Sequence, residues 1–341
     1  MPKKKISETM MSNLYGILPG QIICHPEGAK RPKDPEIIKK REKQMKRFND
    51  EVIQGMTAGN EVRYFAAYTG GVVEEARKIH NTSPISTAAL GRTLTAGAMM
   101  GAMCKNDTDV LTLQFKGDGP LGGVTVTANA KAEVKGLVNN PNVILPKNAA
   151  GHLNVGGAMG SGFLRVIKDI GMKDPYIGQT ELVSGEIGED LTYYFAASEQ
   201  IPTSVGVGVL LSRDNVVEHA GGFIIQLLPF ATEQTIRWLE EVLAGVHSVT
   251  EYFADGYSLD DLVHALLGGD ATIERRMPVS WKCGCNREKV EKTLMSVGRA
   301  ELLDMIREGE PITLHCDFCN TDYTFSIPEI QQLLDSGRVR S

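Results

Sequence analysis

Four of the chain's six cysteines lie in two short motifs near its C-terminal end. Cys283 and Cys285 form a C-x-C motif, Cys316 and Cys319 form a C-x-x-C motif, and 30 residues separate the two motifs. Two close pairs of thiolates, joined by a spacer that can fold back, supply the four ligands of a tetrahedral Zn²⁺ ion. We therefore expect one zinc ion per chain, bound by these four cysteines while they are reduced.

The C-x-x-C motif also occurs in thiol–disulfide oxidoreductases, so its surroundings decide between metal binding and redox catalysis. In those enzymes the motif follows a strand and opens a helix, whose N-terminus lowers the pKa of one thiol. Here it lies between two alternating runs, 312–314 and 323–325, a pattern that predicts a hairpin with the cysteines at its tip. This presentation is typical of a metal site. His315 could replace a cysteine as a ligand, but four thiolates leave no need for it.

The C-terminal unit, residues 281–341, combines few large apolar side chains with 8 basic and 10 acidic residues. A metal ion would contribute the folding free energy that so small a core cannot supply. The same all-thiolate ligand set can be oxidised, because a sulfenic acid on one cysteine reacts onward to a disulfide. Oxidation of both pairs would remove all four ligands, so the site can be a structural staple and a redox switch at once.

Just upstream of this unit, residues 231–270 contain eight acidic residues and one basic residue, a local charge of −7. Two short amphipathic helices are predicted there. Their apolar positions are Ile236, Leu239, Val242, Leu243 and Val246 in the first and Leu259, Leu262, Val263, Leu266 and Leu267 in the second. Helices this short are marginal unless their apolar faces dock elsewhere. Residues 231–280 are therefore either an ordinary pair of surface helices or a metastable linker whose docking can be lost.

Residues 50–230 carry the pattern of an α+β domain. Strands are expected at 62–68, 110–115, 124–128, 132–138, 162–170, 176–183, 205–212 and 222–228, and helices at 71–80, 83–104 and 186–197. Ser83 and Pro84 would start the second of these helices as its N-cap and first turn. Runs of strands interrupted by grouped helices favour an α+β architecture over a doubly wound sheet.

The N-terminal extension, residues 1–49, differs in composition from the rest of the chain. It holds 12 Lys/Arg and 5 Asp/Glu, a net charge of +7, so the remaining residues carry −13 of the chain's total of −6. It is rich in proline and has little apolar periodicity, which indicates a poorly ordered segment with a short basic helix at 35–48. Cys24 and His25 could be a metal-ligand pair, but one such pair without a partner cluster indicates an unused thiol.

Charge and hydropathy exclude several classes of protein. A net charge of −6 argues against a nucleic-acid or anionic-membrane partner, since both are negatively charged and bind positively charged proteins more strongly. The N-terminal sequence MPKKKISETMMSNLYG begins with basic residues but lacks the apolar stretch of a signal peptide. The most apolar segment, Thr87 to Cys104, contains Arg92 and three threonines and is expected to be a tightly packed helix rather than a membrane span. We expect a cytoplasmic protein, in which clustered cysteines serve metal or redox chemistry.

No enzyme is predicted. The glycine-rich run at 156–162 lacks the lysine and the strand-to-helix context of a phosphate-binding loop and is expected to be a loop between strands. The sequence contains no nucleophile elbow, kinase motif set or H-E-x-x-H motif. His80, His219, His247 and His264 show no spacing to one another or to acidic residues that calls for catalysis.

The combination of these features resembles the heat-shock protein 33 family of redox-regulated molecular chaperones. The resemblance rests on the two cysteine motifs and their spacing, the short helices before them, and the stretches LQFKGDGPLGG (113–123), GGFIIQLLP (221–229) and LHCDFCNTDYTF (314–325). It covers about residues 50–335. Either cysteine pair alone would not be specific, whereas the combination is.

The resemblance implies a reduced, zinc-bound, inactive monomer in the bacterial cytoplasm. It implies that oxidants join Cys283 to Cys285 and Cys316 to Cys319, that zinc is released, and that the linker, 231–280, unfolds. The product would be an ATP-independent holdase that forms dimers and binds unfolding client proteins. Residues 1–49 and Cys104 lie outside the family pattern, and no role is expected for them from the resemblance.

Two other functions compete with this one. A zinc-ribbon module for nucleic acid or ribosomes would need a basic, aromatic-bearing face, whereas residues 281–341 carry a charge of −2, from 8 basic and 10 acidic residues. A thiol–disulfide oxidoreductase would turn over an external disulfide. The chaperone interpretation predicts neither nucleic-acid binding nor such turnover.

Overall fold

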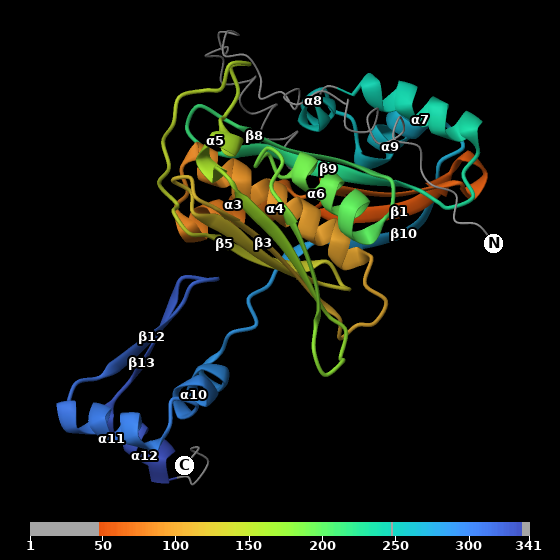
Figure 1. The fold of residues 1–341 in the computed structure, drawn as a ribbon. Helices are drawn as coiled ribbons and strands as arrows, with labels where there is room; N and C mark the ends of the chain where they lie inside the picture. The colour runs from red at the N-terminus through yellow and green to blue at the C-terminus, as the bar shows by residue number, and fades with distance from the viewer. Residues whose placement is uncertain (1–47, 247, 336–341) are drawn as a thin grey trace. The chain divides into compact units, whose positions relative to one another are not determined.

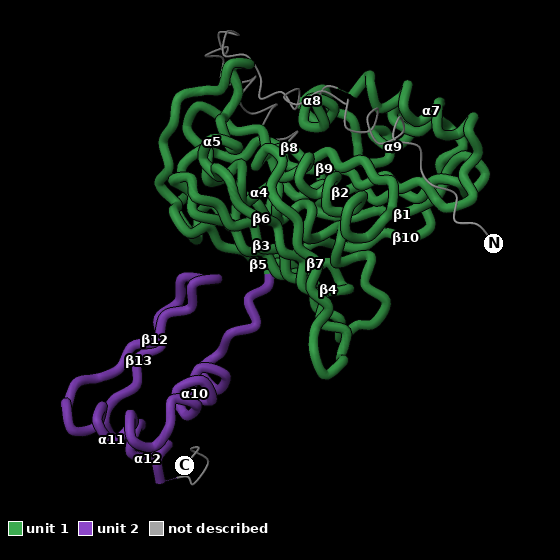
Figure 2. The backbone as a smooth tube through the Cα atoms, in the orientation of Figure 1, with its two compact units in different colours: residues 1–281 green, residues 282–341 purple. Residues whose placement is uncertain are grey.

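The computed structural model describes residues 48–246 and 248–335. The expected helix at 35–48, except for its last residue, the Cys24–His25 pair and His247 lie outside these residues. The chain divides into two compact units, the first ending at Trp281 and the second beginning at Lys282 (Figure 2).

The first unit contains a five-stranded antiparallel sheet, called sheet 1 here, in the order β10-β1-β2-β9-β8. Its strands are β1 (Glu51–Thr57), β2 (Val62–Tyr68), β8 (Thr203–Leu211), β9 (Val217–Leu227) and β10 (Thr272–Pro278). Strands β2, β8 and β9 confirm the expected ones. Strands β1 and β10 were not expected from the sequence, and β10 falls in a segment for which only helices are predicted.

A second, six-stranded sheet, sheet 2, has the order β11-β5-β4-β3-β6-β7. Its strands are β3 (Val110–Gly117), β4 (Gly123–Asn129), β5 (Glu133–Val138), β6 (Gly162–Asp169), β7 (Tyr176–Glu181) and β11 (Ser280–Trp281). The short β11 pairs in parallel with β5, and all other pairs are antiparallel. The expected hairpin of 162–170 with 176–183 is confirmed as β6 and β7.

Helix α4 (Pro84–Ala102) fills the space between the two sheets, and every residue of it after Pro84 is buried (Figure 1). Small residues allow this close packing: a Cβ on Gly91 would lie 2.7 Å from Val209 of sheet 1, and a Cβ on Gly97 would lie 2.7 Å from Val126 of sheet 2. The expected start is confirmed, because the Ser83 hydroxyl accepts a hydrogen bond from the backbone N–H of Ser86. Among the described residues, no helix is long and apolar enough to span a membrane.

The first unit also contains the smaller helices α3 (Gly70–His80), α5 (Val155–Met159) and α6 (Gly188–Tyr194), a 3₁₀ turn (Ala58–Asn60) and a short π-helix (Phe195–Glu199). The prediction that the glycine-rich run 156–162 is only a loop was wrong. It contains most of α5, because the Asn154 side chain accepts a hydrogen bond from the backbone N–H of Gly157 and caps a helical turn.

Three helices lie between β9 and β10 in the chain, where two were expected: α7 (Glu233–Ala244), α8 (Val249–Ala254) and α9 (Leu259–Leu267). Their apolar faces pack on the face of sheet 1 that is turned away from α4 (Figure 1). The alternation along β2 shows the two faces, since Tyr64 and Ala66 contact the cluster under these helices, whereas Phe65 and Ala67 belong to the cluster around α4. We call α7, α8 and α9 the linker helices.

The second unit is small. It consists of α10 (Arg287–Met295), α11 (Arg299–Glu308), the hairpin β12 (Ile312–Cys316) and β13 (Thr321–Phe325), and α12 (Ile327–Asp335). Gly298, whose φ of 103° is outside the helical range, separates α10 from α11. Among this unit's described residues, 282–335, the core contains only five fully buried apolar side chains, which are Leu294, Leu302, Phe325, Ile330 and Leu334.

Candidate metal centre

The second cysteine motif lies at the tip of the β12–β13 hairpin, as the sequence predicts. The two strands pair in register, with Cys316 opposite Thr321 at the last rung. The Cys316 carbonyl accepts hydrogen bonds from the backbone N–H groups of Cys319 (3.3 Å) and Asn320 (2.8 Å). Asn320 takes a positive φ of 56°, which an asparagine tolerates better than most residues. Because of this tight turn, the thiols of Cys316 and Cys319 point to the same side.

The first cysteine motif lies in the loop between β11 and α10. Asn286 ends this loop as the N-cap of α10, where its side chain accepts a hydrogen bond from the backbone N–H of Lys289 (2.9 Å). The Lys289 ammonium in turn donates to the carbonyl oxygen of Gly284, the residue between the two cysteines, at 2.6 Å. The helix start therefore fixes the course of the C-x-C backbone.

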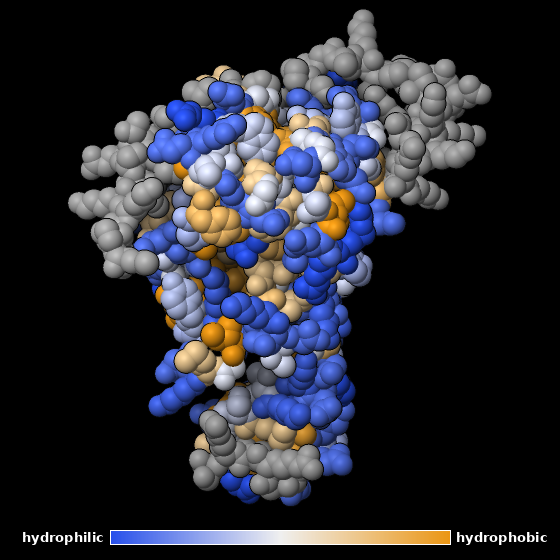
Figure 3. All heavy atoms as spheres, turned by 90° about the vertical axis from the view of Figure 1, so that its right-hand side faces the viewer, coloured by the Kyte–Doolittle hydropathy of each residue, from blue (hydrophilic) through white to orange (hydrophobic). Residues whose placement is uncertain are grey.

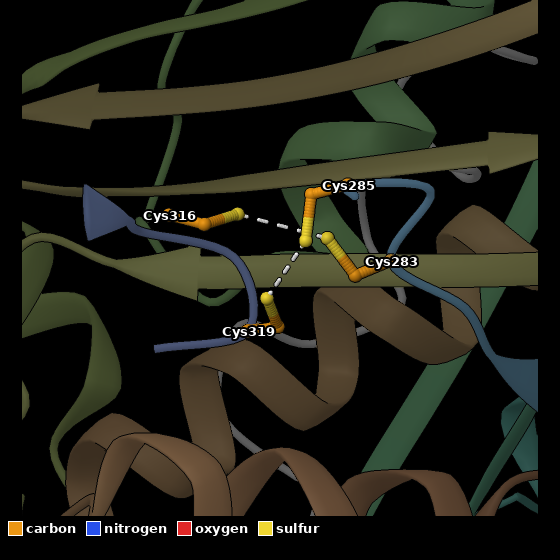
Figure 4. Close-up of side chains that lie close together, drawn as sticks. All are labelled: Cys283, Cys285, Cys316 and Cys319. Atoms are coloured by element: carbon orange, nitrogen blue, oxygen red, sulfur yellow. Dashed lines mark hydrogen bonds between the residues drawn. The ribbon is translucent and has the colours of Figure 1, made fainter. Parts of the chain in front are cut away.

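The four thiols meet in space (Figure 4). All four Sγ atoms lie within 4.8 Å of one another, and two contacts join one cysteine from each motif: 3.7 Å from Cys283 to Cys316 and 3.1 Å from Cys285 to Cys319. In a regular tetrahedral site with Zn–S bonds of about 2.3 Å, neighbouring sulfurs are about 3.8 Å apart. The spacing and the all-sulfur donor set therefore fit a tetrahedral Zn²⁺ ion.

Protons compete with a cation for these thiols. Burial raises the pKa of Cys283 to about 12. Burial acts in the same direction on Cys285, but hydrogen bonds from Tyr323 and the other thiols outweigh it and lower the pKa of Cys285 to about 7. Without a metal the cluster therefore does not favour four thiolates at neutral pH. A divalent cation would have to displace the thiol protons, which makes its affinity pH-dependent.

Tyr323 is a site residue that the sequence analysis did not identify. Its hydroxyl lies 3.2 Å from the Cys285 Sγ, and this hydrogen bond raises the pKa of Tyr323 to about 12. The register of the hairpin explains the contact, because Tyr323 pairs with Leu314 on the strand that leads to Cys316. The alternation of 323–325 was the available signal, but it predicts a strand and not a contact with a thiol.

His315, considered as an alternative ligand, is engaged elsewhere. Its Nδ1 lies 2.6 Å from an oxygen of Asp322 across the hairpin, and this hydrogen bond raises the pKa of His315. Within residues 48–246 and 248–335, the four cysteines form the one cluster of His, Cys, Asp or Glu side chains with the spacing of a metal site.

The other residues that the sequence singled out lie apart from this cluster. His80 makes a hydrogen bond with the Gly136 carbonyl oxygen (2.9 Å), and His219 with the Tyr68 hydroxyl (3.1 Å). Cys104 follows the end of α4, where burial raises the pKa of its thiol. None of these residues, nor His264, belongs to a metal-type cluster in the described part of the chain.

Comparison with known proteins agrees with the motif-based resemblance. The family model described as "Hsp33 protein" matches residues 50–326. A 33 kDa chaperonin from Lachnoclostridium phytofermentans is 50% identical over 288 residues, covering 84% of this chain and 99% of the relative. One from Ruminiclostridium cellulolyticum is 47% identical, covering 84% and 98%.

A solved structure gives the same result for the fold. The crystal structure of the 33 kDa chaperonin (heat shock protein 33 homolog) from Thermotoga maritima aligns with a TM-score of 0.78 at 36% sequence identity, covering 84% of this chain and 98% of that one. The residues that the family model matches, 50–326, include both cysteine motifs and nearly all of the fold. The chain therefore belongs to the Hsp33 family, whose curated members are named 33 kDa chaperonins.

Proposed function

We propose that this chain is a redox-regulated, ATP-independent holdase chaperone of the cytoplasm. In the reduced state Cys283, Cys285, Cys316 and Cys319 hold one zinc ion, and the chain is an inactive monomer. Oxidation joins Cys283 to Cys285 and Cys316 to Cys319, the zinc is lost, the linker (residues 231–280) leaves its docking site, and dimers bind unfolding client proteins. The observation that carries this proposal is the meeting of four thiols from two distant motifs within 4.8 Å.

Bound zinc would supply the cross-link that holds the two cysteine motifs together. Each disulfide needs a two-electron oxidant, for example a peroxide. One thiolate attacks the peroxide to form a sulfenic acid and water, and the neighbouring thiol then displaces a second water to form the S–S bond. Two peroxide molecules thus oxidise four thiols, and no thiolate remains to hold a metal.

Loss of the cross-link would unfold the second unit, because its core is too small to replace it. Five fully buried apolar side chains are a minimal core for about fifty residues. Cys283 lies two residues after Trp281, the last residue of β11, and β11 follows β10 almost directly. Through this chain connection, unfolding of the second unit would remove a constraint from the end of the linker.

Release of the linker would expose two apolar surfaces that now cover each other. From sheet 1 these are Tyr64, Ala66, Tyr68, Phe223, Ile225 and Leu227, and from the linker helices Leu239, Leu243, Phe253, Leu262, Val263 and Leu266. Burying one large apolar side chain is worth roughly 1.5–3 kcal/mol. Several such contacts could hold an unfolded client without any nucleotide, while the linker's charge of −7 keeps the opened protein in solution.

The test compares the reduced and the oxidised chain in one assay. Light scattering by a heat-unfolding client should be suppressed by the oxidised form only, with loss of four free thiols and release of one zinc ion per chain. Equal protection by the reduced form would rule out the switch, even if the zinc content is right. Turnover of insulin disulfides, or salt-sensitive binding of RNA or DNA, would instead favour the oxidoreductase or the nucleic-acid module.

A further inference from the structure

Tyr323 joins the small core of the second unit to the cysteine cluster. It lies on β13 two residues before Phe325, so the two rings project from the same face of the hairpin. Phe325 is buried, and the partly buried ring of Tyr323 packs against the same apolar cluster, as does Leu314 opposite it. Hydrophilic side chains predominate on the face of this unit seen at the lower end of Figure 3. Packing therefore holds the Tyr323 ring in place.

The Tyr323 hydroxyl has one hydrogen-bond partner among the described residues, the Cys285 Sγ at 3.2 Å. Once Cys285 has lost its proton to bind a metal, its sulfur can only accept a hydrogen bond, so the phenolic O–H is the donor. Groups that are hydrogen-bonded to a metal ligand fix its orientation and tune its chemistry. Tyr323 has the position of such a group without being a ligand itself.

A second hydroxyl lies beside the cluster, but it has another acceptor. The Thr321 Oγ1 is 3.3 Å from the Cys319 Sγ and 3.4 Å from the Cys319 carbonyl oxygen, to which it can donate instead. Thr321 is also exposed, whereas Tyr323 is partly buried. The Tyr323 hydroxyl is therefore the more firmly held of the two donors.

We propose that Tyr323 is a positioning residue of the redox switch, whose hydroxyl holds the Cys285 sulfur in the metal site and slows its reaction with oxidants. A sulfur lone pair attacks the O–O bond of a peroxide, which leaves a sulfenic acid on the cysteine and releases hydroxide that takes a proton from solvent to become water. A hydrogen bond to the sulfur withdraws electron density from that lone pair, so the attack is slower. The effect on switching rests on the proposed function, whereas the effect on metal binding rests on the cluster alone.

The test compares the full-length parent with Tyr323→Phe, which keeps the ring and its packing and removes only the hydroxyl. Competition of the reduced chain with a colorimetric zinc chelator should show about ten-fold weaker zinc binding by the variant, as when a partner of a metal ligand is lost. With zinc bound and peroxide in excess, zinc release should be on the order of three- to ten-fold faster, the net effect of one hydrogen bond.

Substitution of zinc by Co²⁺ gives a readout that a merely structural role would not move. Hydrogen bonds stabilise the sulfur lone pairs and so raise the energy of the sulfur-to-cobalt charge-transfer band. The band of Tyr323→Phe should therefore lie at longer wavelength than that of the parent. Its position is read from loaded sites alone, so chains that fail to fold would lower the height of the band but not its energy.

The matched control is Thr324→Val, at the next residue of the same strand. The Thr324 hydroxyl lies 2.9 Å from that of Thr313 across the exposed side of the hairpin. The control thus removes a cross-strand hydroxyl contact instead of a contact with a thiol. It should match the parent in zinc affinity, band position and rate of zinc release.

Three outcomes would overturn the proposal. They are a Tyr323→Phe variant that behaves as the parent in all three measurements, equal changes in the control, and faster zinc release without a band shift, since the tyrosine would then act through hairpin stability alone. A parent chain that binds neither zinc nor cobalt would contradict the proposed function and this inference together. Normal metal binding by the parent with an unaltered Tyr323→Phe would contradict this inference alone, so the two failures are distinguishable.

Discussion

Sheet 1 is covered on both faces, and the two covers are built in different ways. On one face α4 is buried along 18 of its 19 residues between two sheets, and its charged Arg92 pairs with Glu186 at 2.5 Å. On the other face α7 buries only 2 of its 12 residues, Leu239 and Leu243, and its outer side faces solvent. The α4 face cannot open without separating the two sheets, whereas we propose that the linker helices leave as a layer.

Metal removal should show the largest difference between the two covers. Zinc contributes about 10–16 kcal/mol in zinc-finger peptides, so a chelator should unfold the second unit and free the end of the linker. Each of the two covers contains an arginine at which limited trypsin digestion can report opening. The rate of cleavage at Arg237 in α7 should rise on the order of tenfold or more as that region opens. Arg92 in α4 should stay protected. Equal cleavage at both arginines would mean that the two covers open together.

Matched leucine truncations should separate local from global stability. Leu94 in α4 and Leu262 in α9 are both fully buried at 0% exposure, so each change to alanine should cost about 2–5 kcal/mol. Leu94→Ala should lower the urea midpoint of the whole first unit. Leu262→Ala should instead give client protection without oxidant at a nearly unchanged midpoint. A midpoint lowered equally by both variants would show that sheet 1 and the linker unfold as one.

Acid should weaken the linker face through His219, which touches Phe48 and Tyr68 beneath α8. Burial lowers the pKa of His219 from 6.5 to about 4, so the folded state resists protonation. This contribution to stability is complete above pH 6.5 and is lost as the pH falls towards 4, by on the order of 3 kcal/mol. Denaturation followed from pH 7.5 to 4.5 should show this loss.

His219→Gln is the control for the acid effect, because glutamine keeps a polar group beside the Tyr68 hydroxyl but does not titrate. Its stability should vary less between pH 6.5 and 4.5 than that of the parent chain. If parent and variant lose stability in parallel, His219 does not carry the effect.

The smallest effect is expected at the ion pairs that tie α9 to the edge of sheet 1. Arg276 on β10 lies 2.6 Å from Glu51 and 2.5 Å from Asp260, but all three side chains are partly exposed. Arg276→Ala should therefore cost less than about 1 kcal/mol, seen as slightly faster hydrogen exchange in α9. Lys292→Ala, which removes the exposed pair with Glu288 in the second unit, is the matched control and should leave α9 unaffected.

The same contrast explains which elements the sequence could predict. Helix α4 was predicted with its N-cap because Ser83 and Pro84 are local signals. Strand β1 was missed because Val52 and Ile53 are both buried, one towards α4 and the other towards the linker helices, so the strand has no polar alternation. Strand β10 was missed for the opposite reason, since most of this charged edge strand is not buried and it shows no apolar periodicity.

The sequence predicts those features of the metal centre that depend on neighbouring residues, but not those that depend on packing between distant segments. The hairpin tip around Cys316 follows from the alternation of its flanking strands, so the sequence shows it. The 3.1 Å approach of Cys285 to Cys319 and the Tyr323 hydroxyl beside it depend on how α10 and the hairpin pack, which no local pattern encodes. Helix α8 was missed because six residues are too few to display a helical period.

Linker release is tested most directly by comparing hydrogen exchange in α4 with that in α7–α9, in the reduced and then in the peroxide-oxidised chain. Oxidation should remove the protection of α7, α8 and α9 and leave that of α4 intact. Oxidation that forms both disulfides while all four helices keep their protection, or that exposes α4 as well, would contradict it.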